Sequence, residues 1–165
     1  MKDTSMGPKL SFMSACGSTG RLVAGRILAG SDLLATIEGI CLKHGIENGQ
    51  ITASIGSLKQ VAFNYVSRLS PEPGKGYTTH MTMKGPFSLL AGQGLVSRSD
   101  NPGRMNIHFH AVISGEEDRV YGGHIMPGTI ALSNIDIFLQ EIKGIEIARE
   151  QDPSTGITFT CYKEV

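Results

Sequence analysis

Apolar and polar residues alternate one by one over several stretches of this chain, most clearly from Met105 to Ile113. The odd positions there are Met, Ile, Phe, Ala and Ile, whereas the even positions are Asn, His, His and Val. A period of two is typical of a strand with one face in a core and one polar face. We therefore predict a half-buried strand that points His108 and His110 away from the core.

A turn-forming segment, Gly115 to Asp118, separates this strand from a short second strand that contains His124. If residues 116–118 form a three-residue loop, the antiparallel register places His124 directly opposite His110. Directly opposed residues have Cβ atoms about 4.5–5.5 Å apart, so these rings and His108 would share one face within reach of one ion. A two-residue loop would instead turn His124 to the other face.

The remaining pattern predicts one helix among many strands. The helix spans Asp32 to His44, with an apolar stripe at helical spacing, a cap at Ser31 or Asp32, and Gly45 as its stop signal. Strands and helices do not alternate in series, and 21 glycines without a tryptophan favour a sheet-rich domain with tight turns. Further strands are predicted at Arg21–Leu28, Ile51–Ile55, Val61–Val66, Tyr77–Met83, Gly85–Gly94, Ile130–Leu132, Asn134–Leu139, Ile145–Arg149 and Ile157–Tyr162.

The composition mainly excludes some classes of protein. A chain of 165 residues is long enough for one domain with a real core. Its 15 basic and 15 acidic side chains cancel, so no overall positive field draws it to DNA or to an anionic membrane. No segment approaches the length of a membrane span, and residues 1–20 lack the apolar centre of a signal peptide. We expect a cytoplasmic protein with a flexible arm at 1–20 and a single domain at 21–165.

The three histidines are candidate metal ligands. Neutral imidazoles suit zinc and other late first-row divalent metals, and a tetrahedral ion with three protein ligands keeps a fourth position for water or substrate. The alternative is that His108, His110 and His124 are polar surface residues of a hairpin. Arg104 stands near the start of the histidine strand and could face an anion at the metal, although a solvated loop arginine explains it equally well.

Four motifs in this order resemble the PCC domain, the plant and prokaryote conserved domain, from about Arg21 to about Leu139. The resemblance implies an α+β fold, a mainly antiparallel β-sheet with one principal flanking helix, and assembly as a homotrimer. One departure is Ser88, where the family commonly has an acidic residue. The motifs are Arg26 with Gly30-Ser31-Asp32-Leu33, then Ile55-Gly56-Ser57-Leu58, then Gly85-Pro86-Phe87-Ser88-Leu89-Leu90, and finally His108-Phe109-His110 with Gly122-Gly123-His124.

The same resemblance suggests three possible functions. Plant members carry AT-hook motifs and bind DNA, whereas this chain has no hook and keeps the histidines, as the prokaryotic stand-alone members do. The histidine hairpin also resembles acetolactate decarboxylase, a zinc enzyme whose fold is related to that of the PCC domain. We therefore weigh a metal-dependent enzyme, either a decarboxylase-like lyase or a hydrolase, against a non-catalytic metal-containing regulatory module and a DNA-binding protein.

For the enzyme hypothesis, the expected substrate is a small carboxylated or hydroxy- or oxo-acid metabolite. The ion, for which the ligand set makes zinc the first candidate, would polarise the oxygens of that acid. An arginine would hold its remote carboxylate, with Arg104 as the first candidate and Arg26 as the second. In the implied homotrimer, the metal sites would lie near subunit boundaries, where an arginine of a neighbouring copy could reach them.

Overall fold

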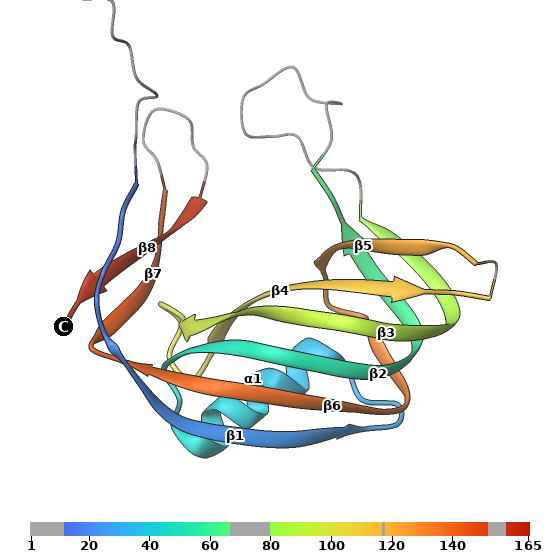
Figure 1. The fold of residues 1–165 in the computed structure, drawn as a ribbon, viewed down its shortest axis with the longest axis horizontal. Coiled ribbons are helices and arrows are strands. Elements are labelled where there is room, and N and C mark those ends of the chain that lie inside the picture. Colours follow the sequence, from blue (N-terminus) through green and yellow to red (C-terminus); the bar gives the residue numbers. More distant parts are fainter. Residues whose placement is uncertain (1–11, 67–79, 117, 152–157) are drawn as a thin grey trace, which may run out of the picture.

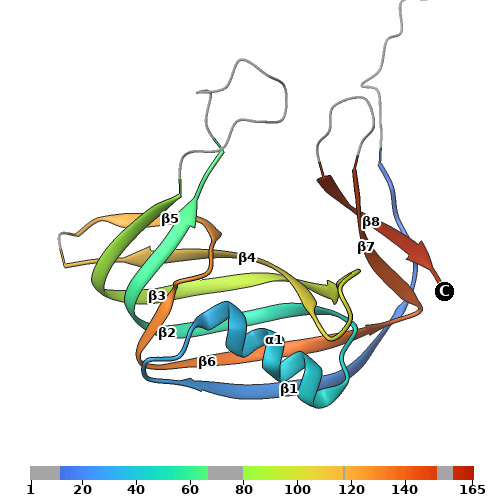
Figure 2. The same ribbon diagram turned by 180° about the vertical axis from the view of Figure 1, so that it is seen from behind.

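The computed structural model describes residues 12–66, 80–116, 118–151 and 158–165. The fold is dominated by antiparallel β-structure, with one α-helix against it (Figures 1 and 2). This agrees with the predicted arrangement of a mainly antiparallel sheet and one principal helix. The elements are β1 (Ser18–Leu28), α1 (Leu33–His44), β2 (Asn48–Asn64), β3 (Met81–Arg98), β4 (Met105–Ser114), β5 (Val120–Ile125), β6 (Ile130–Lys143), β7 (Ile145–Gln151) and β8 (Thr158–Glu164).

The main sheet has six strands in the order β1-β6-β2-β3-β4-β5. All of its neighbouring strands are antiparallel, and β5 also pairs with the end of β2. The strands β2, β3, β4 and β5 therefore form a closed circuit. Strands β7 and β8 form a separate hairpin that rises from one end of the sheet (Figure 1). Among the described residues, the outer edge of β1 has no partner strand, and the face turned away from α1, here called the free face, exposes large apolar side chains.

Helix α1 begins and ends at the capping residues predicted from the sequence. Asp32 is the N-cap, and its side chain accepts a hydrogen bond from the backbone N–H of Ala35 at 3.0 Å. Gly45 ends the helix in the left-handed conformation, with φ of 61°, which glycine adopts without a steric penalty. The apolar stripe of α1 is buried against the sheet through Leu33, Ile37 and Cys41, all fully inaccessible to solvent.

Three strands are longer than predicted. The two strands predicted at Ile51–Ile55 and Val61–Val66 belong to one strand, β2. Gly56 lies inside this strand, at a point so close to β6 that there is no room for a side chain. A Cβ at that glycine would stand 2.3 Å from the backbone oxygen of Asn134. The segments predicted at 130–132 and 134–139 likewise merge into β6, and β3 joins the described part of 77–83 to 85–94. Register shifts keep these long strands paired, and local sequence patterns do not reveal such shifts.

Some of the predicted segments lie partly outside the residues that the structure describes. Strand β1 begins at Ser18, and Ser18 and Thr19 pair with β6, so the end of the expected arm at 1–20 belongs to the sheet. Residues 1–11, 77–79 and 157 lie outside the described residues. No helix within the described part of the chain is long and apolar enough to cross a membrane.

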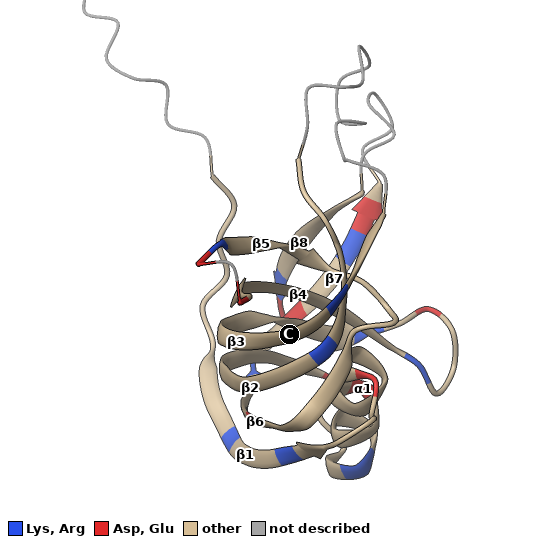
Figure 3. Cartoon of the chain, turned by 90° about the vertical axis from the view of Figure 1, so that its right-hand side faces the viewer, with Lys and Arg blue, Asp and Glu red and all other residues tan. Residues whose placement is uncertain are grey.

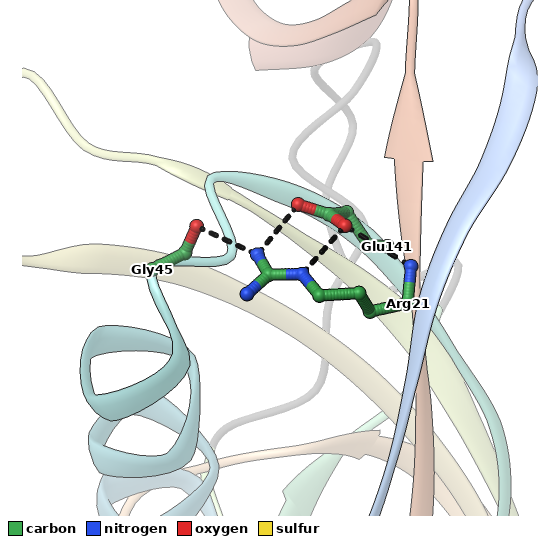
Figure 4. A network of polar contacts seen from close by, with 3 residues as sticks. All are labelled: Arg21, Gly45 and Glu141. Atoms are coloured by element: carbon green, nitrogen blue, oxygen red, sulfur yellow. Dashed lines mark hydrogen bonds and ion pairs between the residues drawn. The ribbon is translucent and has the colours of Figure 1, made fainter.

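A network of polar contacts joins β1, β6 and the end of α1 (Figure 4). The Arg21 guanidinium donates to both carboxylate oxygens of Glu141, at 2.9 and 2.8 Å, and also to the backbone oxygen of Gly45 at 3.4 Å. The backbone N–H of Arg21 donates to Glu141 as well, at 3.0 Å. These hydrogen bonds from Arg21, together with its positive charge, lower the pKa of Glu141 to about 2.

This lowered pKa predicts how acid affects stability. The stabilisation by Glu141 is fully present above its unfolded pKa of about 4.5 and is lost as the pH falls toward the folded pKa of about 2. Glu141→Gln is therefore expected to be less stable than wild type at neutral pH and equally stable at the acid end of this range. Urea unfolding across pH measures the difference. Glu150→Gln, at the exposed pair with Lys163, is the control and should change stability little.

Candidate metal centre

Strands β4 and β5 bring the three predicted histidines together. His110 lies directly opposite His124, as the predicted three-residue loop requires. The backbone N–H of Gly115 bonds the oxygen of Arg119 at 3.2 Å, and Asp118 has the positive φ of 53° that is common at the last position of such a loop. The loop length is therefore confirmed, although residue 117 lies outside the described residues.

The alternation of β4 also agrees with the prediction. Phe109 is fully buried, Ala111 is buried, and His110 between them is exposed. Because side chains alternate across a strand, His108 and His110 lie on the face away from α1, and His124 joins them through the β4–β5 register. The sheet packing thus fixes the backbone positions from which all three rings project.

Glycines let the neighbouring strands approach this hairpin closely. A Cβ at Gly94 on β3 would stand 2.1 Å from the backbone oxygen of His108. A Cβ at Gly123 on β5 would stand 2.4 Å from the backbone oxygen of Asn64 on β2. Real Cβ atoms do not come so near to backbone atoms, so any larger residue would displace a strand that carries or borders a histidine.

The spacing of the imidazoles fits one metal ion. The ring centroid of His108 lies 4.9 Å from that of His110 and 4.8 Å from that of His124. The centroids of His110 and His124 are 5.2 Å apart. One ligand atom of each residue lies within 4.8 Å of the others, and the Nε2 atoms of His108 and His110 are 3.1 Å apart. Two nitrogens bound to a tetrahedral zinc are about 3.3 Å apart.

The environment keeps these rings neutral. Burial lowers the pKa of all three histidines, and for His124 burial with the neighbouring positive charges lowers the pKa to about 4. A neutral imidazole has a free lone pair, which is the form that binds a metal. At neutral pH the cluster is therefore ready to coordinate a cation without first releasing protons.

The two candidate arginines lie in different places. Arg104 and His124 border the same cavity, of about 510 Å³, on the α1 side of β4. The Arg104 side chain donates to Glu38 of α1 at 2.7 Å. Arg26 lies on β1, at the opposite edge of the sheet, and donates to Asp136 at 2.6 Å. Within one chain the structure therefore places Arg104 beside a cavity that His124 also borders, on the opposite side of β4 from the other two histidines, and it places Arg26 at the far edge of the sheet.

Arg149 lies near the histidine cluster, and the sequence did not single it out. It belongs to the same face of β7 as Ile147, which is buried against the main sheet, and its positive charge helps to lower the pKa of His108 and His124. With Asn106 it borders a cavity of about 410 Å³. Nothing in the sequence around Arg149 marks it, because only the position of the β7–β8 hairpin brings it near β4.

The family model of the Plants and Prokaryotes Conserved (PCC) domain matches residues 14–143. The chain therefore belongs to the PCC domain family. Its match to two curated relatives, each a bifunctional protein GlmU from a Synechococcus strain, is 24% identical over 131 residues. The chain spans 19% and 18% of the length of these relatives, so they share one segment with it.

Solved structures share the fold over nearly their whole length. A plant- and prokaryote-conserved protein from Pyrococcus horikoshii is 32% identical, with a TM-score of 0.74, and the match covers 93% of this chain and 99% of that one. A metal-containing protein from Archaeoglobus fulgidus is 23% identical, with the same TM-score of 0.74 and coverage of 92% and 99%. These matches agree with the antiparallel sheet and flanking helix described above.

Proposed function

We propose that this protein binds one zinc ion per chain through His108, His110 and His124 and acts as a metal-dependent enzyme on a small organic acid. The observation that carries the proposal is the convergence of three imidazoles on one face of the β4–β5 hairpin. The metal-containing relative from Archaeoglobus fulgidus, which has the same fold, supports it.

The open side of the cluster favours a reactive site over a purely structural ion. Among the described residues, the group of His, Cys, Asp and Glu side chains close enough to share an ion consists of these three histidines. His110 is exposed, so solvent or a small molecule can approach the fourth position. A zinc ion there would stabilise negative charge developing on substrate oxygens or activate water.

The nearby arginines indicate an acidic substrate. Arg149 extends positive charge toward His108 and His124. Arg104 borders a cavity with His124, but its charge is balanced by Glu38. We therefore propose that Arg149 holds the remote carboxylate of a hydroxy- or oxo-acid and that Arg104 is a second binding position. The reaction class that fits best is lyase or hydrolase chemistry.

The free face of the sheet supports the proposed homotrimer. Leu22 and Leu28 on β1 alternate with buried Ile27, so they lie on the face away from α1, and they are 62% and 65% exposed. Ile55 on β2 and Phe138 on β6 are 55% and 41% exposed. A neighbouring copy on this apolar face would cover it. Light scattering tests this assembly, and a monomer at micromolar concentration would contradict it.

The same assembly would give Arg26 a role. Arg26 lies between Leu22 and Leu28 on the free face of the edge strand β1, where a second copy would make contact. In that arrangement Arg26 of one copy could approach the histidines of the next, whereas it cannot do so within its own chain. A site completed in this way would lie at a subunit boundary.

DNA binding is the weaker proposal for this chain. Basic and acidic residues are interspersed along the structure (Figure 3), and they cancel over the whole sequence. Binding to DNA gains most of its affinity from phosphate contacts by an excess of basic residues. Neither the composition nor the view in Figure 3 provides such an excess.

The direct test of function is a panel of hydroxy-, oxo- and dicarboxylic acids incubated with zinc-loaded and metal-free protein and followed by mass spectrometry. Turnover is expected only with metal. Arg149→Ala should raise the KM for the acid about tenfold or more, since a charged hydrogen bond contributes about 1.5–3 kcal/mol. Arg104→Ala should have a smaller effect because Glu38 already pairs with that arginine.

Other outcomes of this panel would revise the proposal. Turnover without metal would contradict it, and zinc binding without turnover of any acid would favour the non-catalytic regulatory module. If Arg26→Ala alone raised the KM, the site would be completed by a neighbouring copy. Lys43→Ala, at an exposed cation in the last turn of α1 that borders neither of the two cavities described, is the control.

A further inference from the structure

Asn64, the last residue of β2, carries an unusual buried atom. Its side-chain oxygen Oδ1 is shielded from solvent and accepts no hydrogen bond from any described residue. A buried acceptor without a donor is unfavourable, and such atoms are rare in folded proteins. An orphan acceptor of this kind therefore calls for a donor that the described residues do not supply in this conformation.

The register of β2 and β5 places this atom beside the histidine cluster. Asn64 lies directly opposite His124, just as His124 lies opposite His110 on its other side. The preceding pair, Phe63 and Ile125, is 3% and 2% exposed and belongs to the core. Because successive residues alternate between faces, Asn64 and His124 lie together on the other face.

The backbones are also unusually close at this point. A Cβ at Gly123 would stand 2.4 Å from the backbone oxygen of Asn64, so β5 can lie against the end of β2 only because residue 123 is glycine. Directly opposed residues have Cβ atoms about 4.5–5.5 Å apart. The Asn64 amide is therefore within side-chain reach of the His124 ring.

The chemistry of a metal-bound histidine supplies the missing donor. When one ring nitrogen binds the ion, the other carries a proton, and it almost always donates that proton to an acceptor that holds the ring in place. We propose that Asn64 is this positioning residue: its Oδ1 accepts the ring N–H of His124 in the zinc-bound protein and selects the tautomer that ligates. The inference rests on the proposed metal site and adds the residue that orients it.

The experiment measures zinc affinity by competition with a chromophoric chelator, in the full-length protein. Asn64→Leu keeps most of the side-chain volume but removes the acceptor, and it should weaken zinc binding about 10- to 100-fold. Asn64→Asp restores an acceptor and should bind zinc at least as tightly as wild type. The melting temperature of metal-free Asn64→Leu should not fall, because the substitution removes an unsatisfied buried atom.

Ser54 provides a matched control, because it also has a buried side-chain oxygen without a hydrogen-bond partner among the described residues. Unlike Asn64, however, Ser54 lies in the core, where its Cβ is 3.2 Å from the position that a Cβ of Gly92 would take. Ser54→Ala should leave zinc affinity unchanged. In zinc-loaded wild type, NMR should show a slowly exchanging ring N–H of His124, and this signal should be lost in Asn64→Leu and recovered in Asn64→Asp.

Two results would overturn the inference, and they can be told apart. If wild type binds zinc and Asn64→Leu binds it equally tightly with the His124 ring N–H signal intact, Asn64 does not position the ligand although the metal site stands. If wild type binds no zinc, the proposed function fails and the role of Asn64 fails with it. If Asn64→Leu does not fold, Asn64→Ala replaces it in the same comparison.

Discussion

Replacement of His110 and His124 together by alanine is expected to abolish zinc binding. The two residues lie opposite each other across β4 and β5 and would supply two of the three proposed ligands. Zinc sites in small proteins contribute about 10–16 kcal/mol, shared among few ligands, so the loss of two should weaken binding by more than about 1,000-fold. Elemental analysis of protein purified without a metal-affinity tag measures the metal content.

The remaining two histidines provide a matched control. His44 ends helix α1 and His80 precedes β3, and both are exposed. The double variant His44→Ala with His80→Ala removes the same number of imidazoles and should keep one zinc per chain. Full metal content in the His110 and His124 double variant would show that the ion is held elsewhere and would contradict the site.

Substitution of Gly94 by alanine is expected to damage both the fold and the site. The new Cβ would stand 2.1 Å from the backbone oxygen of His108 and 3.0 Å from the Cα of Phe109. Neither atom can move without breaking the β3–β4 pairing, in which Gly94 lies opposite Phe109. Overpacking of this kind costs about 1–3 kcal/mol, and we expect the upper end because the obstacle is backbone.

Gly94→Ala should also reduce zinc affinity, because a shift of β4 moves His108 and His110 relative to His124 on β5. Gly39 in helix α1 is the control, since a Cβ there has no neighbour within 4 Å. Gly39→Ala should raise stability by about 0.5–1 kcal/mol and leave zinc binding unchanged. Chemical denaturation measures both effects. A Gly94→Ala variant as stable as wild type would show that β3 and β4 are less closely paired than described.

The histidine hairpin could be predicted because its signals are local. The alternation from Met105 to Ile113 assigns the faces of β4, and the loop length sets the partner of each residue in β5. These two features are sufficient to place His110 opposite His124, which the structure confirms. Helix α1 was predictable for a similar reason, since its N-cap at Asp32 and its stop at Gly45 lie next to its apolar stripe.

The long strands were harder to predict because glycine is ambiguous in a sequence. Gly56 resembles a turn signal, yet it lies inside β2, where close contact with β6 excludes a side chain. The same pattern of short apolar runs separated by small residues fits either two strands or one strand with a register shift. Which of the two forms depends on the neighbouring strand, and that information is distant in the sequence.

The sequence by itself therefore determined the histidine cluster, since all three histidines lie within one hairpin whose geometry follows from alternation and loop length. Only the tertiary structure decided what surrounds them. Arg149 comes near the histidines because the β7–β8 hairpin places it beside Asn106 at the start of β4, where the two line one cavity, and Asn64 lies opposite His124 because β5 also pairs with β2. Such contacts between distant segments depend on how whole elements pack together, and no short-range pattern encodes that packing.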